Sequence, residues 1–264
     1  MIDEVFARRY GSWAVVAGAS EGLGAAWAEA LAARGLHLVL ISRRPEVLET
    51  TASSIRAKRG VEVRTVPFDL ASTNFGQELE RIAADVDVGF AVFNAAHAPR
   101  GQFLELALED QLRSIEVNCR GPLTMAHVLG KRMAARGRGG LVLMSSLTAF
   151  NGSPFITTYG ATKAFNLVLA EGLWFELRAR GVDVLACAAG ATLTPGFKKA
   201  SPAGEPGMIE PAQVVEEALE KLGRTGVMIP GAFNRFASFL MRRVLPRRTA
   251  VAILGNRTRN LVLP

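Results

Sequence analysis

A tyrosine and a lysine stand four residues apart, at Tyr159 and Lys163. On a helix this spacing places both side chains on the same face. A neighbouring ammonium group favours the charged form of a phenol and therefore lowers its pKa from about 10. A tyrosine in that setting can donate or accept a proton near neutral pH, so the pair is a candidate for acid–base catalysis. The alternative is an ordinary amphipathic helix that carries an exposed lysine.

Ser146 stands thirteen residues before Tyr159, just after the apolar run 141–144. In an open α/β sheet, ligands bind beyond the carboxyl ends of the strands. We therefore expect the Ser146 hydroxyl to hydrogen-bond a substrate carbonyl. The alternative is a serine that simply ends a strand.

A glycine-rich turn with Gly18, Gly22 and Gly24 follows the first apolar run, 13–17. Glycines at such a turn let the backbone approach a pyrophosphate, and the free N–H groups of the next helix face its negative charge. The spacing Gly-x-x-x-Gly-x-Gly differs from the general Gly-x-Gly-x-x-Gly fingerprint. Its place directly after the first strand nevertheless predicts a dinucleotide site.

The second apolar run, 37–41, leads into Ser42, Arg43 and Arg44. Sites for NAD usually have an acidic residue here for the ribose 2′-hydroxyl, whereas an arginine accommodates the 2′-phosphate of NADP. Because no carboxylate stands at this point, the sequence predicts NADP(H) as the cofactor. The alternative is that both arginines form the solvated start of a helix.

Short apolar runs alternate with longer helical segments, which predicts a parallel sheet covered on both faces. The predicted strands are 13–17, 37–41, 61–68, 88–93, 141–144, 182–186 and 227–229. The predicted helices are 23–34, 46–58, 74–84, 109–135 and 157–179. We find no linker or internal repeat, so we expect residues 1–264 to form a single Rossmann-like, doubly wound α/β domain with about seven strands.

The composition, with 49% apolar and 21% charged residues in 264, is typical of a soluble globular protein. No run approaches the roughly 18 apolar residues of a membrane-spanning helix. No apolar signal segment follows the start, so we expect a cytoplasmic protein. Two cysteines make no disulfide framework, and three scattered histidines indicate no metal site.

The positive charge is confined to one end of the chain. Residues 221–264 hold nine basic and no acidic residues, whereas residues 1–220 hold 22 basic and 24 acidic residues. A nucleic-acid-binding domain usually carries its charge on a dedicated face of the folded body. The near-neutral body therefore argues against a nucleic-acid partner.

Together these residues resemble the pattern of the short-chain dehydrogenase/reductase superfamily over about residues 11–200. Locally, the segment 18–48 resembles the branch of NADP-dependent 3-oxoacyl-thioester reductases and hydroxysteroid dehydrogenases. The resemblance implies that Tyr159 is the general acid/base and that Ser146 polarises the carbonyl. It implies that Lys163 modulates the tyrosine and binds the nicotinamide ribose, and that Asn118 supports a water relay to this lysine.

The resemblance also implies a cofactor-binding set. Within it, Asp69 would contact the adenine and Thr194 the carboxamide. The full set is Gly18, Ser20, Glu21, Gly22, Leu23, Gly24, Ser42, Arg43, Arg44, Asp69, Leu70, Asn94, Ala95, Ala96, Tyr159, Lys163, Gly190, Thr192 and Thr194. Two residues depart from the family pattern, because Ala96 replaces the usual glycine and Ala189 the usual proline. Asp69 and Asn94 also suit ordinary turns or caps.

The implied reaction is hydride transfer from NADPH to a ketone while Tyr159 protonates the developing alkoxide. One alternative is an NADP-dependent alcohol dehydrogenase that works in the oxidative direction. Another is a sensor or scaffold that binds NADPH without turnover. The complete catalytic set of Asn118, Ser146, Tyr159 and Lys163 argues against the second alternative, because binding alone needs no Tyr–Lys pair.

In the resembling family, substrate loops follow the strands that carry Asn94 and Ser146, and a lid follows Gly190. We therefore expect a lid at 191–209. Apolar and aromatic residues in these segments predict a hydrophobic ketone, such as a 3-oxoacyl, steroid-like or aromatic polyketide-like compound, rather than a sugar. The predicted substrate residues are His97, Leu147, Phe150, Phe155 and Phe197.

The last segment, 232–264, predicts a basic amphipathic extension, because apolar residues recur at helical spacing among arginines. Such an extension could lie on an anionic membrane, cover the substrate mouth, or attract the phosphates of an acyl carrier. The alternative is a terminal helix packed on the domain with its arginines in water. The family resemblance further suggests a homodimer or homotetramer formed through the long helices.

Overall fold

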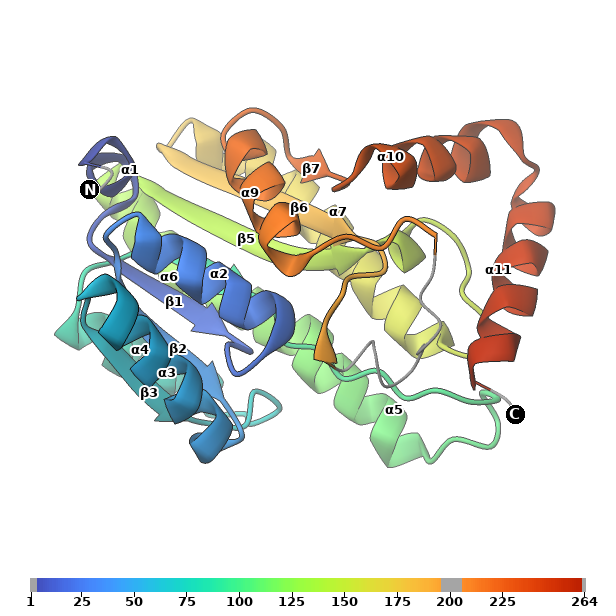
Figure 1. Cartoon of the computed structure of the whole chain (residues 1–264), viewed down its shortest axis with the longest axis horizontal. Coiled ribbons are helices and arrows are strands. Elements are labelled where there is room, and N and C mark those ends of the chain that lie inside the picture. Colours follow the sequence, from blue (N-terminus) through green and yellow to red (C-terminus); the bar gives the residue numbers. More distant parts are fainter. Residues whose placement is uncertain (1–3, 196–205, 263–264) are drawn as a thin grey trace.

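The computed structural model describes residues 4–195 and 206–262. One sheet of seven parallel strands runs through it in the order β3-β2-β1-β4-β5-β6-β7 (Figure 1). The strands are β1 (Trp13–Ala17), β2 (His37–Ser42), β3 (Val63–Pro67), β4 (Val88–Phe93), β5 (Gly139–Ser146), β6 (Val182–Ala189) and β7 (Val227–Met228). This order confirms the predicted Rossmann-like α/β fold.

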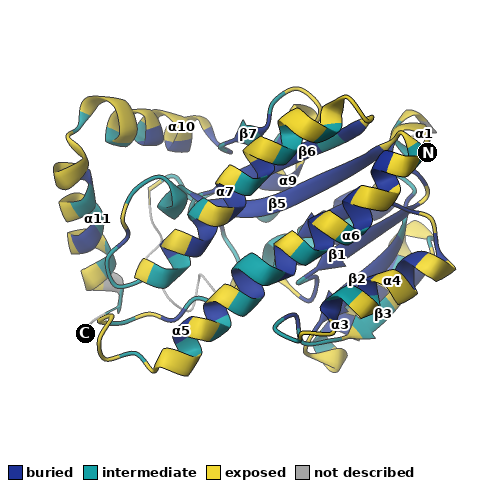
Figure 2. Ribbon diagram, turned by 180° about the vertical axis from the view of Figure 1, so that it is seen from behind, coloured by how far each residue is buried: buried dark blue, intermediate teal, exposed yellow. Residues whose placement is uncertain are grey.

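Helices cover both faces of the sheet (Figures 1 and 2). Trp27, Leu48 and Val214 belong to one core, whereas Leu79 and Met125 belong to the other. The first face is covered by α2 (Gly22–Ala33), α3 (Pro45–Arg59) and α9 (Pro211–Lys221). The second face is covered by α4 (Phe75–Asp85), α6 (Gly121–Arg136) and α7 (Thr157–Arg178), and α5 (Leu108–Ile115) packs against α7. The sheet is therefore the middle layer of three.

Strand β1 shows why the strands appear in the sequence as continuous apolar runs. Ala14 and Val16 point into one core, whereas Val15 and Ala17 point into the other. All five residues of the strand are buried. Because both faces of the strand are buried, every position is apolar, and the sequence shows no alternation of apolar and polar residues.

The long helix predicted over 109–135 is interrupted. A π-helical turn, η1 (Glu116–Arg120), separates α5 from α6. A π turn adds one residue to the hydrogen-bonded ring and so rotates the face that the following residues present. Asn118 lies in this turn and is completely buried. The interruption therefore carries a buried polar side chain between the two helices.

Among the described residues, two helices lie outside the predicted set, namely α9 and the short α1 (Glu4–Tyr10). Helix α1 is held by contacts with residues distant in sequence. The Tyr10 hydroxyl donates to Asp183 Oδ2 at 2.8 Å, and Arg9 Nη2 pairs with the same oxygen at 2.6 Å. A helix of seven residues is marginal alone, so these tertiary contacts decide its formation.

The C-terminal residues form α10 (Ala232–Phe239), a π-helical turn η3 (Leu240–Val244) and α11 (Arg247–Val262). This confirms the predicted helical spacing. Phe233, Phe236 and Phe239 are each more than half exposed, so this face of α10 is uncovered within the chain. Further exposed apolar side chains belong to the helices of the second face, including Leu112 in α5 and Val168 in α7. Self-association through that face stays a prediction.

Strand β1 lies between β2 and β4, so the chain leaves β1 toward one edge of the sheet and returns through β4 toward the other. Such a reversal opens a crevice beyond the carboxyl ends of the central strands. The loops that follow β1, β2, β3 and β4 should therefore meet in one place.

Candidate functional site

The glycine-rich turn between β1 and α2 requires glycine for two separate reasons. Gly18 has a positive φ of 85°, and a Cβ there would lie 2.6 Å from the Ala95 backbone nitrogen. At Gly24, in α2, a Cβ would lie 1.9 Å from the Gly18 carbonyl oxygen. Asn94 Nδ2 donates to that same oxygen at 2.9 Å and fastens the turn to the end of β4. A phosphate could therefore come close to the backbone N–H groups at the start of α2.

A cavity of about 440 Å³ lies beside this turn, within the usual size range of ligand sites. It collects much of the predicted cofactor set from four different loops. Its lining consists of Gly18, Ser20, Glu21, Ser42, Arg43, Arg44, Asp69, Leu70, Asn94, Ala95, Ala96, His97 and Val117. A glycine cradle and a polar lining of both charges fit a dinucleotide, so these residues could hold the predicted cofactor.

The other predicted cofactor residues do not line this cavity. Leu23 lies in the first turn of α2, beside the glycine turn. Thr194 lies against that turn, because a Cβ at Gly22 would be 3.0 Å from Thr194 Cγ2. Thr192 is buried and donates to the Gly190 carbonyl at 3.1 Å. These contacts place the segment after β6 next to the turn.

Part of the predicted lid, 191–209, can be compared with the structure. Its two ends are joined, because the Leu193 N–H donates to the Ile209 carbonyl at 3.0 Å. Thr192 and Ile209 also form a parallel bridge. Residues 196–205, including Phe197, lie outside the described residues.

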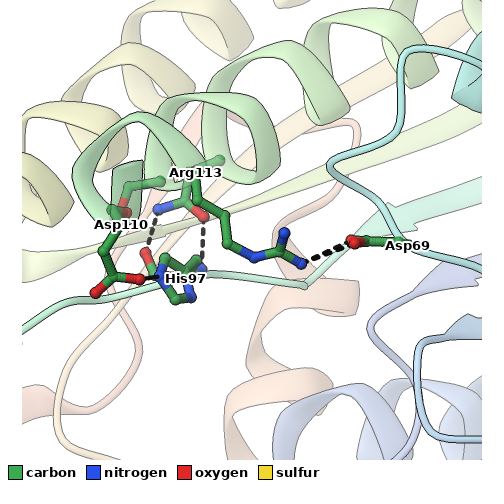
Figure 3. A network of polar contacts seen from close by, with 6 residues as sticks. Asp69, His97, Asp110 and Arg113 are labelled. Carbon is green, nitrogen blue, oxygen red and sulfur yellow. Dashed lines mark hydrogen bonds and ion pairs between the residues drawn. The ribbon is translucent and has the colours of Figure 1, made fainter. Parts of the chain in front are cut away.

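Charged side chains at the β2 and β3 ends of the cavity are arranged in pairs. Arg44 Nη2 lies 2.7 Å from Glu21 Oε1, so the second arginine of the pair is bound to the glycine turn. Arg113, from α5, lies 2.8 Å from Asp69 Oδ2 (Figure 3). Burial alone would raise the pKa of Asp69, but the hydrogen bonds from Arg113 and the Ala71 N–H outweigh it and lower the pKa.

Asn118 connects the loop after β4 to α7. Its Oδ1 accepts the His97 N–H at 2.7 Å, and its Nδ2 donates to the His97 carbonyl at 2.8 Å. Nδ2 also donates to Thr162 Oγ1 at 2.9 Å. These three bonds use both N–H donors of the buried amide and one of the two acceptor positions of its oxygen. The structure therefore assigns the Asn118 side chain to holding the loop and helix together.

His97, a predicted substrate residue, lines the cofactor cavity. Its Nε2 lies 2.6 Å from Asp110 Oδ1 of α5 (Figure 3). Helix α5 therefore holds the loop after β4 through Asp110 and the loop after β3 through Arg113.

Ser146 and Tyr159 lie within hydrogen-bonding reach of each other, one from a strand end and the other from a helix start. Ser146 is the last residue of β5, and Tyr159 lies in the first turn of α7. Burial raises the pKa of Tyr159 above its usual range, while hydrogen bonding with Ser146 and the charge of Arg100 offset part of this. This direction is opposite to the lowering predicted from the lysine. A phenol with a raised pKa is protonated at neutral pH and can act as an acid.

Lys163 is almost completely buried, one turn after Tyr159. Its Nζ donates to the Met144 carbonyl at 2.8 Å and lies 5.5 Å from the centre of the Tyr159 ring. Burial lowers the pKa of Lys163 to about 8. The ammonium therefore lies near the Tyr159 ring, but its hydrogen bond goes to the backbone of β5 and not to the tyrosine hydroxyl.

The predicted substrate residues of the loop after β5 separate in the structure. Leu147 lies in a 3-10 turn, η2 (Leu147–Ala149), directly beside Ser146. Phe150 lines a second cavity, of about 830 Å³, and its ring centre lies 3.9 Å from Arg242 Cζ. Phe155 has a φ of 65°, unusual for a residue with a side chain, and its ring lies 5.6 Å from Arg259 Cζ. Their contact with substrate stays a prediction.

The C-terminal extension packs on this same loop. A Cβ at Gly255 of α11 would lie 3.0 Å from Pro154 Cγ, and one at Gly152 would lie 3.4 Å from Val251 Cγ2. Figure 1 shows α11 beside the segment that leads into α7. Among the predicted roles of the extension, this placement favours a helix packed beside the substrate loops. Contact with a membrane or an acyl carrier stays a prediction.

Four residues of the site were not predicted from the sequence: Asp110, Arg113, Val117 and Thr162. The spacing of Asp110 and Arg113 places them on one helix face, but that spacing is common on solvated helices. Thr162 stands between Tyr159 and Lys163 in the sequence, and no pattern there marks it as a functional residue. Only the packing of α5 and α7 shows what these side chains bind.

Within residues 4–195 and 206–262, no helix is both long and apolar enough to cross a bilayer. The same ranges contain no group of three or more His, Cys, Asp or Glu side chains placed to hold a metal ion.

The family model described as short chain dehydrogenase matches residues 12–204, which include the glycine turn, the cavity and the catalytic set. The chain belongs to the short-chain dehydrogenase family. It is therefore an oxidoreductase, as the resemblance implied.

Individual members agree with this assignment. The chain is 30% identical to a 7beta-hydroxysteroid dehydrogenase of Clostridium sardiniense, over 95% of this chain and 97% of that protein. A structure solved to explain 7beta-hydroxysteroid dehydrogenase stereoselectivity superimposes with a TM-score of 0.89 at 31% identity, covering 94% of this chain and 98% of the other. A short-chain dehydrogenase of Sphingobium yanoikuyae in complex with NADPH has a TM-score of 0.74 at 28% identity, covering 96% of each chain. These matches confirm the predicted hydroxysteroid dehydrogenase branch.

We expect the buried Lys163 to make the activity of this short-chain dehydrogenase sensitive to alkaline pH. The reductive kcat/KM should be level below pH 8 and fall above it, because Lys163 loses its proton with a pKa of about 8 while Tyr159 stays protonated. Initial rates in constant-ionic-strength buffers between pH 6 and 10 would measure this. A reductive kcat/KM that rises from pH 7 to 9 would contradict it. Circular dichroism at each pH would show whether the chain remains folded.

Proposed function

We propose that this short-chain dehydrogenase uses NADPH to reduce the ketone of a hydrophobic substrate. The observation that carries the proposal is the meeting of Ser146, Tyr159 and Lys163 in a fold whose glycine turn and Arg43 line a cavity of ligand size. The relatives named above support a steroid-like ketone first, with 3-oxoacyl and aromatic polyketide-like ketones as further members of the same class.

The preference for NADP rests on Arg43. It is exposed at the end of β2 and lines the cavity, and no acidic residue occupies the position that an NAD enzyme uses for the ribose. Arg44 is bound to Glu21, so Arg43 is the better candidate for the 2′-phosphate. Gly18 and the start of α2 would hold the pyrophosphate.

When bound, the cofactor supplies a hydride to the carbonyl carbon. Tyr159 would donate the proton to the carbonyl oxygen, a role that suits a phenol protonated at neutral pH. The Ser146 hydroxyl would stabilise charge on that oxygen. Lys163 would bind the ribose, and Asn118 would hold the loop and helix at the required separation.

Two other functions are less well supported. The same residues would catalyse alcohol oxidation, but the proposed preference for NADP, which rests on Arg43, argues against that direction. A sensor that binds NADPH without turnover would need no buried Lys163 beside Tyr159.

The test is consumption of NADPH with a panel of ketosteroids, 3-oxoacyl thioesters and bulky aromatic ketones, with Arg43→Ala alongside. We expect turnover of at least one class. Loss of one charge-assisted contact should raise the KM for NADPH about 10- to 100-fold and leave that for NADH nearly unchanged. Arg59→Ala, which removes an exposed ion pair with Glu29, is the matched control. Binding of NADPH without turnover of any class would favour the sensor.

A further inference from the structure

Opposite charges meet where β2 and β3 end. The two strands are paired so that Ser42 lies opposite Pro67, and the Phe68 N–H donates to the Ser42 carbonyl at 2.9 Å. Arg43 follows one residue after Ser42, and Asp69 follows two residues after Pro67. Both line the same cavity. Their charges interact, since Arg43 contributes to the lowered pKa of Asp69.

A free carboxylate at this place would oppose a phosphate in two ways. It would repel the phosphate directly, and it would offset the positive charge of Arg43. Arg44 cannot compensate fully, because its guanidinium is paired with Glu21. In the part of the chain that the structure describes, no carboxylate forms an ion pair with Arg43. Glu21, the other carboxylate of the cavity lining, is paired with Arg44, so Asp69 is the carboxylate whose charge would oppose a phosphate beside Arg43.

Arg113 removes this obstacle. Its Nη2 lies 3.0 Å from Asp69 Oδ1 and 2.8 Å from Oδ2, so it contacts both carboxylate oxygens. The Ala71 N–H also donates to Oδ1, at 3.1 Å. The carboxylate is thus engaged on the side of α5 (Figure 3).

Helix α5 is itself held against the cavity. Asp110, one turn before Arg113, binds the imidazole of His97, and the His97 backbone is bound to Asn118. Two contacts from one helix face therefore hold the loops after β3 and β4. The position of Arg113 opposite Asp69 is a consequence of this arrangement and does not depend on the ion pair alone.

We propose that Arg113 determines the preference for a 2′-phosphorylated cofactor by neutralising Asp69. Arg113 acts through Asp69 and does not need to touch the cofactor, so it is a positioning residue. Asp69 would then contact the adenine while its carboxylate stays paired with Arg113. This inference rests on the proposed function, because it explains how Arg43 can favour NADP although the carboxylate of Asp69 lies nearby.

The test compares NADPH and NADH binding by fluorescence titration of the full-length protein. Arg113→Gln should raise the Kd for NADPH about five- to twentyfold at low salt, while the Kd for NADH should change less than about twofold. The difference should shrink as ionic strength rises, which a purely structural effect would not do. Arg113→Lys keeps the charge and should keep most of the preference. The double variant Asp69→Asn/Arg113→Gln should recover it.

Arg81→Gln, which removes the exposed ion pair with Glu78 on α4, is the matched control and should alter neither Kd. Equal weakening of both cofactors by Arg113→Gln would overturn the inference. If Arg113→Gln does not fold, loss of the preference in the double variant would overturn it. Arg43→Ala separates the two proposals. If Arg43→Ala weakens NADPH and NADH binding equally, the NADP assignment itself is contradicted. If Arg43→Ala weakens mainly NADPH binding while Arg113→Gln weakens both cofactors equally, only the role of Arg113 is contradicted.

Discussion

Tyr159→Phe is expected to lower the reductive kcat by about 10²- to 10⁴-fold, the usual contribution of a general acid. The substitution removes only the hydroxyl, which Ser146 faces, and leaves the ring beside Lys163. Affinity for NADPH should change little, because the lysine and the glycine turn are unaltered. Single-turnover rates and NADPH titration, with the ketone that the substrate panel identifies, would measure both quantities.

The chain offers a matched control, because it contains only one other tyrosine. Tyr10 lies in α1, and its hydroxyl donates to Asp183, away from the cofactor cavity. Tyr10→Phe should therefore keep its kcat while losing some thermal stability. Near-normal turnover by Tyr159→Phe would contradict the mechanism, whatever Tyr10→Phe does.

Asn118→Ala is expected to be the most damaging substitution for stability and activity together. It leaves the His97 N–H and carbonyl and the Thr162 hydroxyl without their buried partner. Unsatisfied buried groups of this kind lower the free energy of unfolding by about 2–4 kcal/mol in total. We also expect kcat to fall more than about tenfold, because the loop after β4 and helix α7 would lose their fixed separation. Urea unfolding and steady-state kinetics would measure the two effects.

Thr162→Val distinguishes the bond that Asn118 makes to α7 from the two bonds that it makes to His97. It removes the bond from Asn118 to α7 and keeps both bonds to His97. The free energy of unfolding should then fall by only about 1 kcal/mol. If Asn118→Ala unfolded at the same urea concentration as the wild-type protein and kept its kcat, the connecting role assigned to the amide would be wrong.

The cofactor cavity could be predicted largely from the sequence because its residues directly follow the strands. Once a run such as 13–17 is known to be a parallel strand, the position of the next residues at the sheet edge follows. Gly18, Arg43 and Asn94 are residues of this kind, and all three line the cavity. The catalytic pair was predictable for a similar local reason, since helical spacing alone brings Tyr159 and Lys163 to one face.

The electrostatics of the pair could not be predicted in this way. Spacing places the lysine near the tyrosine, but it does not show where the ammonium points. In the folded chain Nζ is bound to the Met144 carbonyl, and burial dominates the pKa of both side chains. Desolvation depends on everything that surrounds a group, which no local pattern contains.

The sequence by itself determined the α/β fold, the order of its main elements and the residues that follow each strand, because apolar periodicity and strand ends are local properties. The tertiary structure alone decided which partners the charged and amide side chains take. Asp69 is bound by Arg113, His97 by Asp110 and Asn118, and Phe150 lies beside Arg242 and not in the cofactor cavity. These contacts join segments far apart in the chain, and their formation depends on how the helices pack against the sheet.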